Sequence, residues 1–165
     1  MSQTNGYEFT LDKAQAGQKA GLDFDHVESF AAEGAVPFGR GVIHGTNPEK
    51  QVAVPADALG TFAGVSVFTH SREQTLNQDA SMGEQFSGGA QYRDKDTVST
   101  LRKGRIYVLV TAAVEAGEDA YVDVLTEGEE GKFTNVDVDN LATGGVFRSA
   151  ADEGELAIVE VNLPN

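Results

Sequence analysis

The sequence predicts a mostly β protein: one compact β domain, built as a barrel, a β-tulip-like fold or a sandwich, with an extended N-terminal arm. Three observations lead to this prediction. The chain has 165 residues, the size of a single domain, and 19 of them are glycine. From Phe30 onward, short β-rich segments alternate with turn residues. Few segments show the apolar stripe of a helix that packs on a core, and a short helix near 112–116 is the main candidate.

The first 29 residues differ in texture from the rest of the chain. The stretch AQAGQKAG, residues 14–21, is small and polar and offers no apolar face to bury. We therefore predict an extended arm over residues 1–29 and a β domain over residues 30–165. The arm is either ordered by lying on another surface or is a disordered terminus, and the sequence leaves both open.

The strands of the β domain are expected where β-branched and aromatic residues lie between Gly, Pro and polar turns. Residues 71–91 are polar and contain Gly and Ser, which is typical of a long surface loop. The expected strands are 35–45, 50–55, 61–70, 97–102, 105–111, 119–125, 132–138 and 156–163.

The stretch TVSTLRKGRIYVLV, residues 97–110, is the main basic feature of the chain. Three cations cluster there: Arg102, Lys103 and Arg105. Glycine allows a positive φ without steric cost, so we predict a hairpin turn at Lys103 and Gly104.

The strand after this predicted turn is apolar on both faces. Ile106, Val108 and Val110 fall on one face, and Tyr107 and Leu109 fall on the other. Both faces are therefore expected to be covered. The second cover is either the interior of the same domain or another subunit or partner.

Two interpretations of the basic cluster follow. Arginine can bind carboxylates with both arms of its guanidinium, so the cluster can contact an acidic neighbour, including a second copy of this acidic chain. Alternatively, it is a solvated turn that discourages edge-to-edge strand pairing. Our candidate residues for a contact with another subunit or with a partner protein are Arg102, Lys103, Arg105 and Tyr107.

Net charge argues against several classes of partner. The chain has 26 acidic and 12 basic residues and a formal charge of −14. Such a surface repels nucleic acid and anionic membranes. There are no cysteines, so disulfides and cysteine-ligated metals are excluded. No run approaches the ~20 apolar residues of a membrane helix, and the polar N-terminus does not predict a secretory signal.

Motifs for catalysis are absent from the sequence. There is neither a phosphate-binding loop nor a nucleophile elbow of the G-x-S-x-G type. His26, His44 and His70 stand in unrelated local settings. We predict no catalytic residue and no cofactor.

One stretch has the spacing of a calcium loop. In NVDVDN, residues 135–140, oxygen-bearing side chains occupy every second position. However, Asn140 stands where the loop needs glycine, and Val146 stands where it needs a bidentate acid. The alternating Val136 and Val138 instead predict a strand with its acidic face in water, and no metal site is predicted.

Several segments in order and spacing resemble the structural cement, or head-decoration, proteins of tailed bacteriophages. The resemblance covers about residue 29 to the end, and its most specific parts are LRKG and the terminal VNLP. The segments are SFAAEGAVPFGRGVIHGTNPEKQVAVP (29–55), FAGVSVFTH (62–70), VSTLRKGRIYVLV (98–110), AGEDAYV (116–122) and VFRSAADEGELAIVEVNLP (146–164).

This resemblance implies a non-enzymatic protein of the virion, made in the host cytoplasm. Such proteins sit as homotrimers on the outside of an icosahedral head, at threefold and quasi-threefold positions, and bridge major capsid subunits. The resemblance implies no direct contact with nucleic acid or membrane. The alternatives are another virion surface protein that binds carbohydrate, or a small β-fold hydrolase with a pocket around His70.

Overall fold

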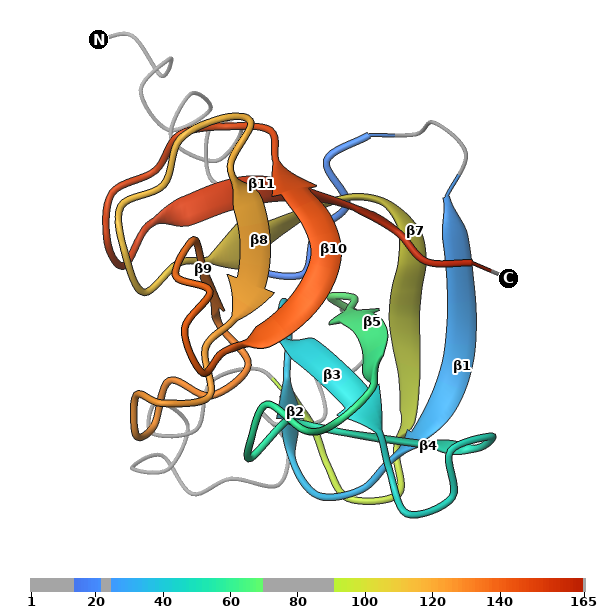
Figure 1. The fold of residues 1–165 in the computed structure, drawn as a ribbon. Coiled ribbons are helices and arrows are strands. Elements are labelled where there is room, and N and C mark those ends of the chain that lie inside the picture. Colours follow the sequence, from blue (N-terminus) through green and yellow to red (C-terminus); the bar gives the residue numbers. More distant parts are fainter. Residues whose placement is uncertain (1–13, 22–24, 70–90, 165) are drawn as a thin grey trace, which may run out of the picture.

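The computed structural model describes residues 14–21, 25–69 and 91–164. These residues form strands and no helix (Figure 1). The mostly β prediction is therefore confirmed. The strands are β1 (His26–Ala32), β2 (Val36–Pro37), β3 (Gly41–His44), β4 (Gln51–Ala53), β5 (Phe62–Ser66), β6 (Gln91–Tyr92), β7 (Thr97–Leu109), β8 (Asp119–Val122), β9 (Phe133–Thr134), β10 (Leu141–Phe147) and β11 (Leu156–Asn162).

Five strands close into a barrel, one of the three architectures that the sequence left open. Their order is β1-β4-β3-β5-β7, and β7 pairs again with β1. The β1–β4 pair is parallel, and the other pairs of the barrel are antiparallel. The short pair β2–β6 stands apart from this sheet.

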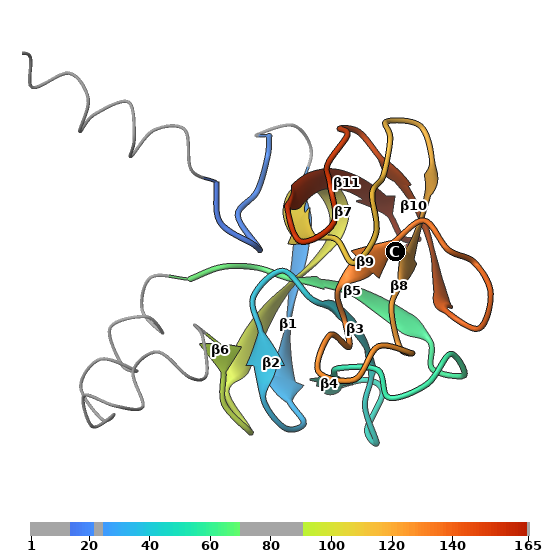
Figure 2. The ribbon, with the colours of Figure 1, turned by 90° about the vertical axis from the view of Figure 1, so that its left-hand side faces the viewer.

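Strand β7 continues beyond the barrel into a second group of strands. Its second half pairs with β11, and the sheet then runs through β10 and β8 to β9. An isolated bridge between Val110 and Phe133 brings β9 back to the end of β7. Figure 1 shows β8, β9 and β10 on one side of the molecule and β1 on the opposite side, and Figure 2 shows the same groups after a quarter turn.

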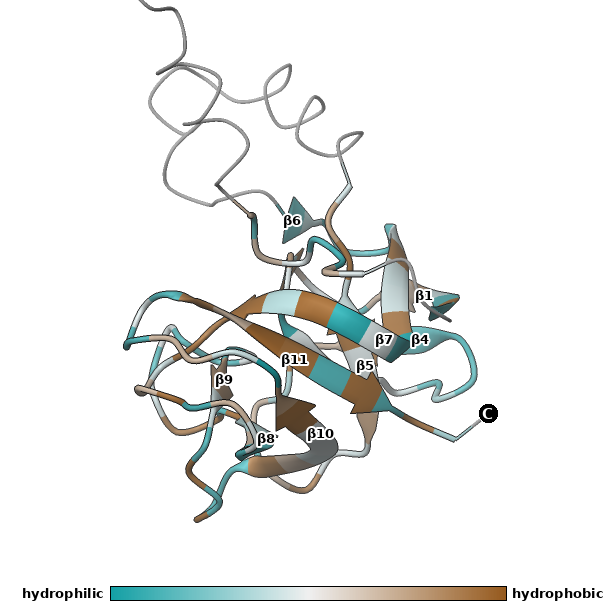
Figure 3. Cartoon of the chain, turned by 90° about the horizontal axis from the view of Figure 1, so that it is seen from above, coloured by the Kyte–Doolittle hydropathy of each residue, from teal (hydrophilic) through white to brown (hydrophobic). Residues whose placement is uncertain are grey.

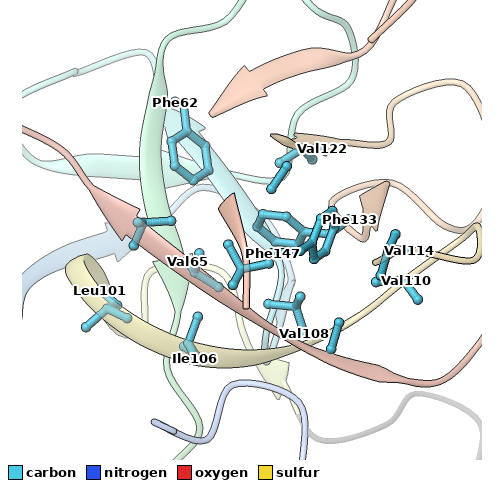
Figure 4. Close-up of a cluster of buried hydrophobic side chains, with 14 of the residues drawn as sticks. Phe62, Val65, Leu101, Ile106, Val108, Val110, Val114, Val122, Phe133 and Phe147 are labelled. Atoms are coloured by element: carbon cyan, nitrogen blue, oxygen red, sulfur yellow. The ribbon is translucent and has the colours of Figure 1, made fainter. Parts of the chain in front are cut away.

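Two hydrophobic cores follow from this arrangement. The barrel core receives side chains from every barrel strand and is closed by Val36 and Tyr92 of β2 and β6. The second core lies between β5, β7 and the strands β8 to β11, and includes Ile106, Phe133 and Phe147 (Figure 4). Along β7 and β11, brown apolar positions alternate with polar ones, as the pleat of a strand requires (Figure 3).

Strand β5 serves both cores and is buried along its whole length. Phe62 and Val65 belong to the second core, whereas Ala63 belongs to the barrel core. Gly64 allows the close approach of β7, since a Cβ there would lie 2.4 Å from the carbonyl oxygen of Leu101. Strand β5 therefore has both of its faces covered inside the domain.

The hairpin predicted at Lys103 and Gly104 is wrong. Strand β7 passes through both residues without a break, and Gly104 has a φ of 134° within it. A Cβ on Gly104 would lie 2.6 Å from Oδ1 of Asp25, so glycine is needed here for a close approach rather than for a turn.

Three further local predictions differ from the structure. Residues 112–116 form turns and a single bridge instead of a helix. Of the strand expected at 132–138, two residues belong to β9, and the alternating valines lie on a loop. Strands β1, β6 and β10 were not predicted. Most of the loop expected at 71–91 lies outside the described residues.

The N-terminal segment contacts the barrel where it is described. Strand β1 begins at His26, before the predicted end of the arm at residue 29. Residues 17–20 lie beside β7 through a bridge between Lys19 and Ile106. Residues 1–13 and 22–24 lie outside the described part of the chain, so the division at residue 29 stays a prediction.

Candidate interaction surface

Arg102 joins three parts of the chain. Its Nη1 donates to Oε2 of Glu28 on β1 at 3.0 Å, and its Nη2 donates to the carbonyl oxygen of Pro164 at 3.1 Å. Nε2 of His26 lies 2.9 Å from the other carboxylate oxygen of Glu28. The hydrogen bond to His26, followed by that to Arg102, holds the pKa of Glu28 below its ordinary value. Arg102 thus serves the fold of its own chain.

Arg105 shares a carboxylate with a second arginine. Its Nε donates to Oε2 of Glu160 on β11 at 2.7 Å, and Nε of Arg148 donates to the same oxygen at 3.0 Å. These hydrogen bonds, from Arg148 first and Arg105 second, lower the pKa of Glu160. The single negative charge of Glu160 is thus shared by two arginines, so these three side chains together keep a net positive charge.

Lys103 and Tyr107 lie on the same face of β7 as Arg105, by the alternation of the strand. Lys103 is exposed and has no ion-pair partner among the described residues. Tyr107 is half-buried, and its backbone N–H and C=O bond to Gln18 and Gly17. Residues of this same chain therefore cover the edge of β7 beside Tyr107.

A shallow hollow of about 320 Å³ lies beside this face. Lys103, Arg105 and Glu160 line it together with Ala20 and Asn162. Lys103 has no ion-pair partner among the described residues, and Arg105 shares the charge of Glu160 with Arg148, so this hollow is positively charged. The arrangement suits a contact with a carboxylate from a neighbouring protein.

The described residues gather no obvious catalytic set. His26 pairs with Glu28, and His44 packs edge-on against Phe30 with the ring centroids 5.7 Å apart. His70 lies outside the described part of the chain. Within that part, no three potential ligands are placed to hold a metal ion, and no helix is long and apolar enough to cross a membrane.

The acidic partners of the basic cluster escaped sequence reasoning. Glu28 lies in the segment that was predicted to be an arm, so nothing suggested that it pairs with β7. Glu160 did leave a signal, because a charged residue stands between Val159 and Val161 in an apolar strand. An acid at such a position requires either solvent or a cation on its face of the sheet.

Comparison with known families decides the class of the protein. The chain matches, over residues 2–162, the family model described as structural cement protein (E217 gp24/Pam3 gp6). The chain belongs to this phage cement protein family. The resemblance seen in the sequence is thereby confirmed, and the protein is a structural protein of a bacteriophage capsid. No curated protein sequence matches the chain.

Solved structures of two phage proteins have the same fold. A chain from the capsid of Myoviridae phage XM1 superposes with a TM-score of 0.68 at 20% identity, over 90% of both chains. The N base of the head fibre gp8.5 of bacteriophage phi29 gives a TM-score of 0.51 at 12% identity, over 84% of this chain and 94% of that one. At such identities the likeness shows a shared fold.

Proposed function

We propose that this cement protein decorates the outside of an icosahedral phage head as a homotrimer, at threefold and quasi-threefold positions. It bridges neighbouring major capsid subunits and stabilises the shell against internal pressure. Its role is mechanical, without catalysis. The observation that carries this proposal is the family match over residues 2–162.

The physical properties of the chain support this role. A formal charge of −14 disfavours contact with packaged DNA and suits an outer surface. A trimer presents three copies of one contact surface, so modest single affinities combine into tight retention. The closed barrel also leaves its own five strands without a free edge for edge-to-edge aggregation.

We also propose that the basic cluster, Arg102, Lys103, Arg105 and Tyr107, lies at a subunit or capsid contact. Lys103 is the member with an unpaired charge, whereas both arginines hold strands of the same chain together. Lys103→Ala therefore tests the contact without disturbing the fold. We expect it to weaken the trimer or shell binding, and unchanged behaviour in both would remove the cluster from the contact.

The first test is the mass of the protein in solution by light scattering, followed by co-sedimentation with undecorated shells of the phage. The proposal expects a trimer that sediments with the shells at one trimer per threefold position. A monomer that stays in the supernatant would contradict it.

A further inference from the structure

Apolar side chains stand exposed on two adjoining loops at one side of the molecule. Leu125 lies on the loop between β8 and β9 and is 62% exposed. Val136 and Val138 lie on the loop between β9 and β10 and are 46% and 65% exposed. Among the described residues, five large hydrophobic side chains are exposed, and these two loops hold three of them. Exposed apolar side chains that lie in a group indicate an interaction surface, whereas single exposed ones are normal.

Asn140 ties the two loops together. Its side-chain Oδ1 accepts from the N–H of Val124 at 3.1 Å, and its Nδ2 donates to the carbonyl oxygen of Val136 at 3.1 Å. The two loops that hold the exposed apolar side chains are thereby fixed relative to each other. A fixed surface loses little conformational entropy when it binds.

The first loop has two additional supports. The buried carboxylate of Asp123 accepts from the N–H groups of Leu125 and Thr126 at 2.9 and 3.0 Å. Burial by itself raises the pKa of Asp123, but the hydrogen bonds, led by that from Thr126, outweigh this effect and leave the pKa below its ordinary value. Asp123 therefore stays charged and keeps Leu125 in place.

Arg40 supports the same loop from the barrel side. Its Nη1 donates to the carbonyl oxygens of Glu129 and Glu130 at 3.0 and 2.9 Å. Gly131 lies so close that a Cβ there would be 3.1 Å from Cβ of Arg40. The loops are thus anchored to the folded domain while their apolar tips face outward.

Carboxylates neighbour the exposed apolar residues on both loops. Residues 123–140 contain six acids and one lysine, and the lysine, Lys132, forms an ion pair with Glu129. Glu127, Asp137 and Asp139 are exposed beside the tips. The exposed apolar side chains are therefore interspersed with negative charges along both loops.

This charge pattern disfavours a second copy of the chain as the occupant. Two such surfaces would bring their carboxylates together. The basic cluster of another copy offers only a small positive charge, because Arg102 pairs with Glu28 and two arginines share Glu160, and it belongs to a chain whose formal charge is −14. The complementary partner is a different protein surface, with an apolar cleft rimmed by lysine or arginine.

We infer that Leu125, Val136 and Val138, with the carboxylates around them, form the face that docks on the capsid shell, in an apolar cleft with a basic rim on the major capsid protein. This inference rests on the proposed function. It assigns the shell contact to the loops of the second strand group, on the opposite side of the molecule from β1 (Figure 1).

The test is the triple variant L125S/V136S/V138S, measured by co-sedimentation with undecorated shells of the phage major capsid protein. Its matched control is Val27→Ser, which removes an exposed valine, 40% accessible, from β1. The triple variant should bind at least about tenfold more weakly than the native protein, and the control should bind like it. Thermal unfolding checks that both remain folded.

Three outcomes would overturn the inference. Native binding with an unchanged triple variant rejects this face but leaves the proposed function standing. A triple variant that loses its trimer instead of its shell affinity makes the face a subunit interface. Failure of the native protein to bind any shell overturns the proposed function and the inference with it.

A second variant tests the rim. E127Q/D137N/D139N removes three charges and keeps the shapes of the side chains; asparagine also tolerates the positive φ of 58° at Asp139. If the cleft has a basic rim, added salt should weaken native binding, and the variant should show both weaker binding and a smaller dependence on salt. Equal salt dependence in both proteins would contradict the basic rim.

Discussion

At the scale of single residues, Glu160 links three strands through its carboxylate. Arg105 of β7 and Arg148, which follows β10, both donate to it from either side of β11. The pKa of Glu160 in the folded chain is lowered, so the ion pairs stabilise the fold above the ordinary pKa of 4.5. That stabilisation decreases as the pH falls through the lower folded pKa.

We therefore predict that Glu160→Gln reduces the free energy of unfolding by about 0.5–1 kcal/mol at pH 7. The difference from the native protein should shrink below pH 4.5, where protonation removes the same charge from native Glu160. Urea unfolding between pH 3 and pH 7 measures this. Glu153→Gln is the control, because Glu153 is exposed and makes no ion pair within the described chain. A constant difference at all pH values would contradict the ion-pair explanation.

Gly39 lets the N-terminal segment approach the barrel closely. Its φ is 69°, and a Cβ there would lie 2.5 Å from the backbone nitrogen of Gly17. Gly34 has a similar φ of 86°, but nothing lies within 4 Å of its Cβ position. Substitutions at these two glycines therefore distinguish the cost of backbone strain from the cost of steric overlap.

Gly39→Ala should destabilise the protein by about 2–4 kcal/mol, because strain and overpacking act together. Gly34→Ala should cost about 1 kcal/mol from strain alone. Limited proteolysis should also cut residues 14–21 faster in the first variant. Equal stability of the two variants would show that the segment does not press on Gly39 in solution.

At the scale of elements, the sequence predicted strands best where side chains alternate. The apolar face of Ile106, Val108 and Val110 is buried as expected. The turn at Gly104 was wrong because glycine serves two purposes, a positive φ in turns and close approach in strands, and the spatial neighbour Asp25 decides between them. Strand β1 escaped notice because it is held by β7, about 70 residues away along the chain.

The segment with Val136 and Val138 was predicted as a strand but forms a loop. Alternation of apolar and acidic residues is typical of a strand, yet here both valines are exposed on a loop. Alternation alone does not supply a partner strand, and Asn140 instead bonds back to the carbonyl of Val136. The alternation of apolar and acidic residues on this loop is therefore not matched by pairing in a sheet.

Asn140→Ala should loosen both loops and reduce the free energy of unfolding by about 1–2 kcal/mol, because two hydrogen bonds are lost. Hydrogen exchange at the amide of Val124 should accelerate, since this amide loses its acceptor. Asn47→Ala is the control, because the exposed side chain of Asn47 makes no hydrogen bond among the described residues. Unchanged exchange at Val124 would mean that Asn140 does not hold the loops.

At the scale of the whole molecule, the two cores share β5 and β7. Leu101 and Val108 of β7 belong to the second core, and Val98 of the same strand belongs to the barrel core. If β7 detached from one core, apolar side chains of the other core would become exposed as well. We therefore expect the barrel and the second strand group to unfold as one cooperative unit.

Val98→Ala in the barrel core and Val159→Ala in the second core test this cooperativity. Each valine is fully buried, so each change should cost about 2–3 kcal/mol. Calorimetry at a fixed protein concentration should show one transition, and both variants should move it to a lower temperature by a similar amount. Two transitions, each sensitive to one of the variants, would mean that the cores unfold separately. In that case the loops proposed to dock on the shell would separate from a folded barrel, and the proposed stabilisation of the shell would be weakened.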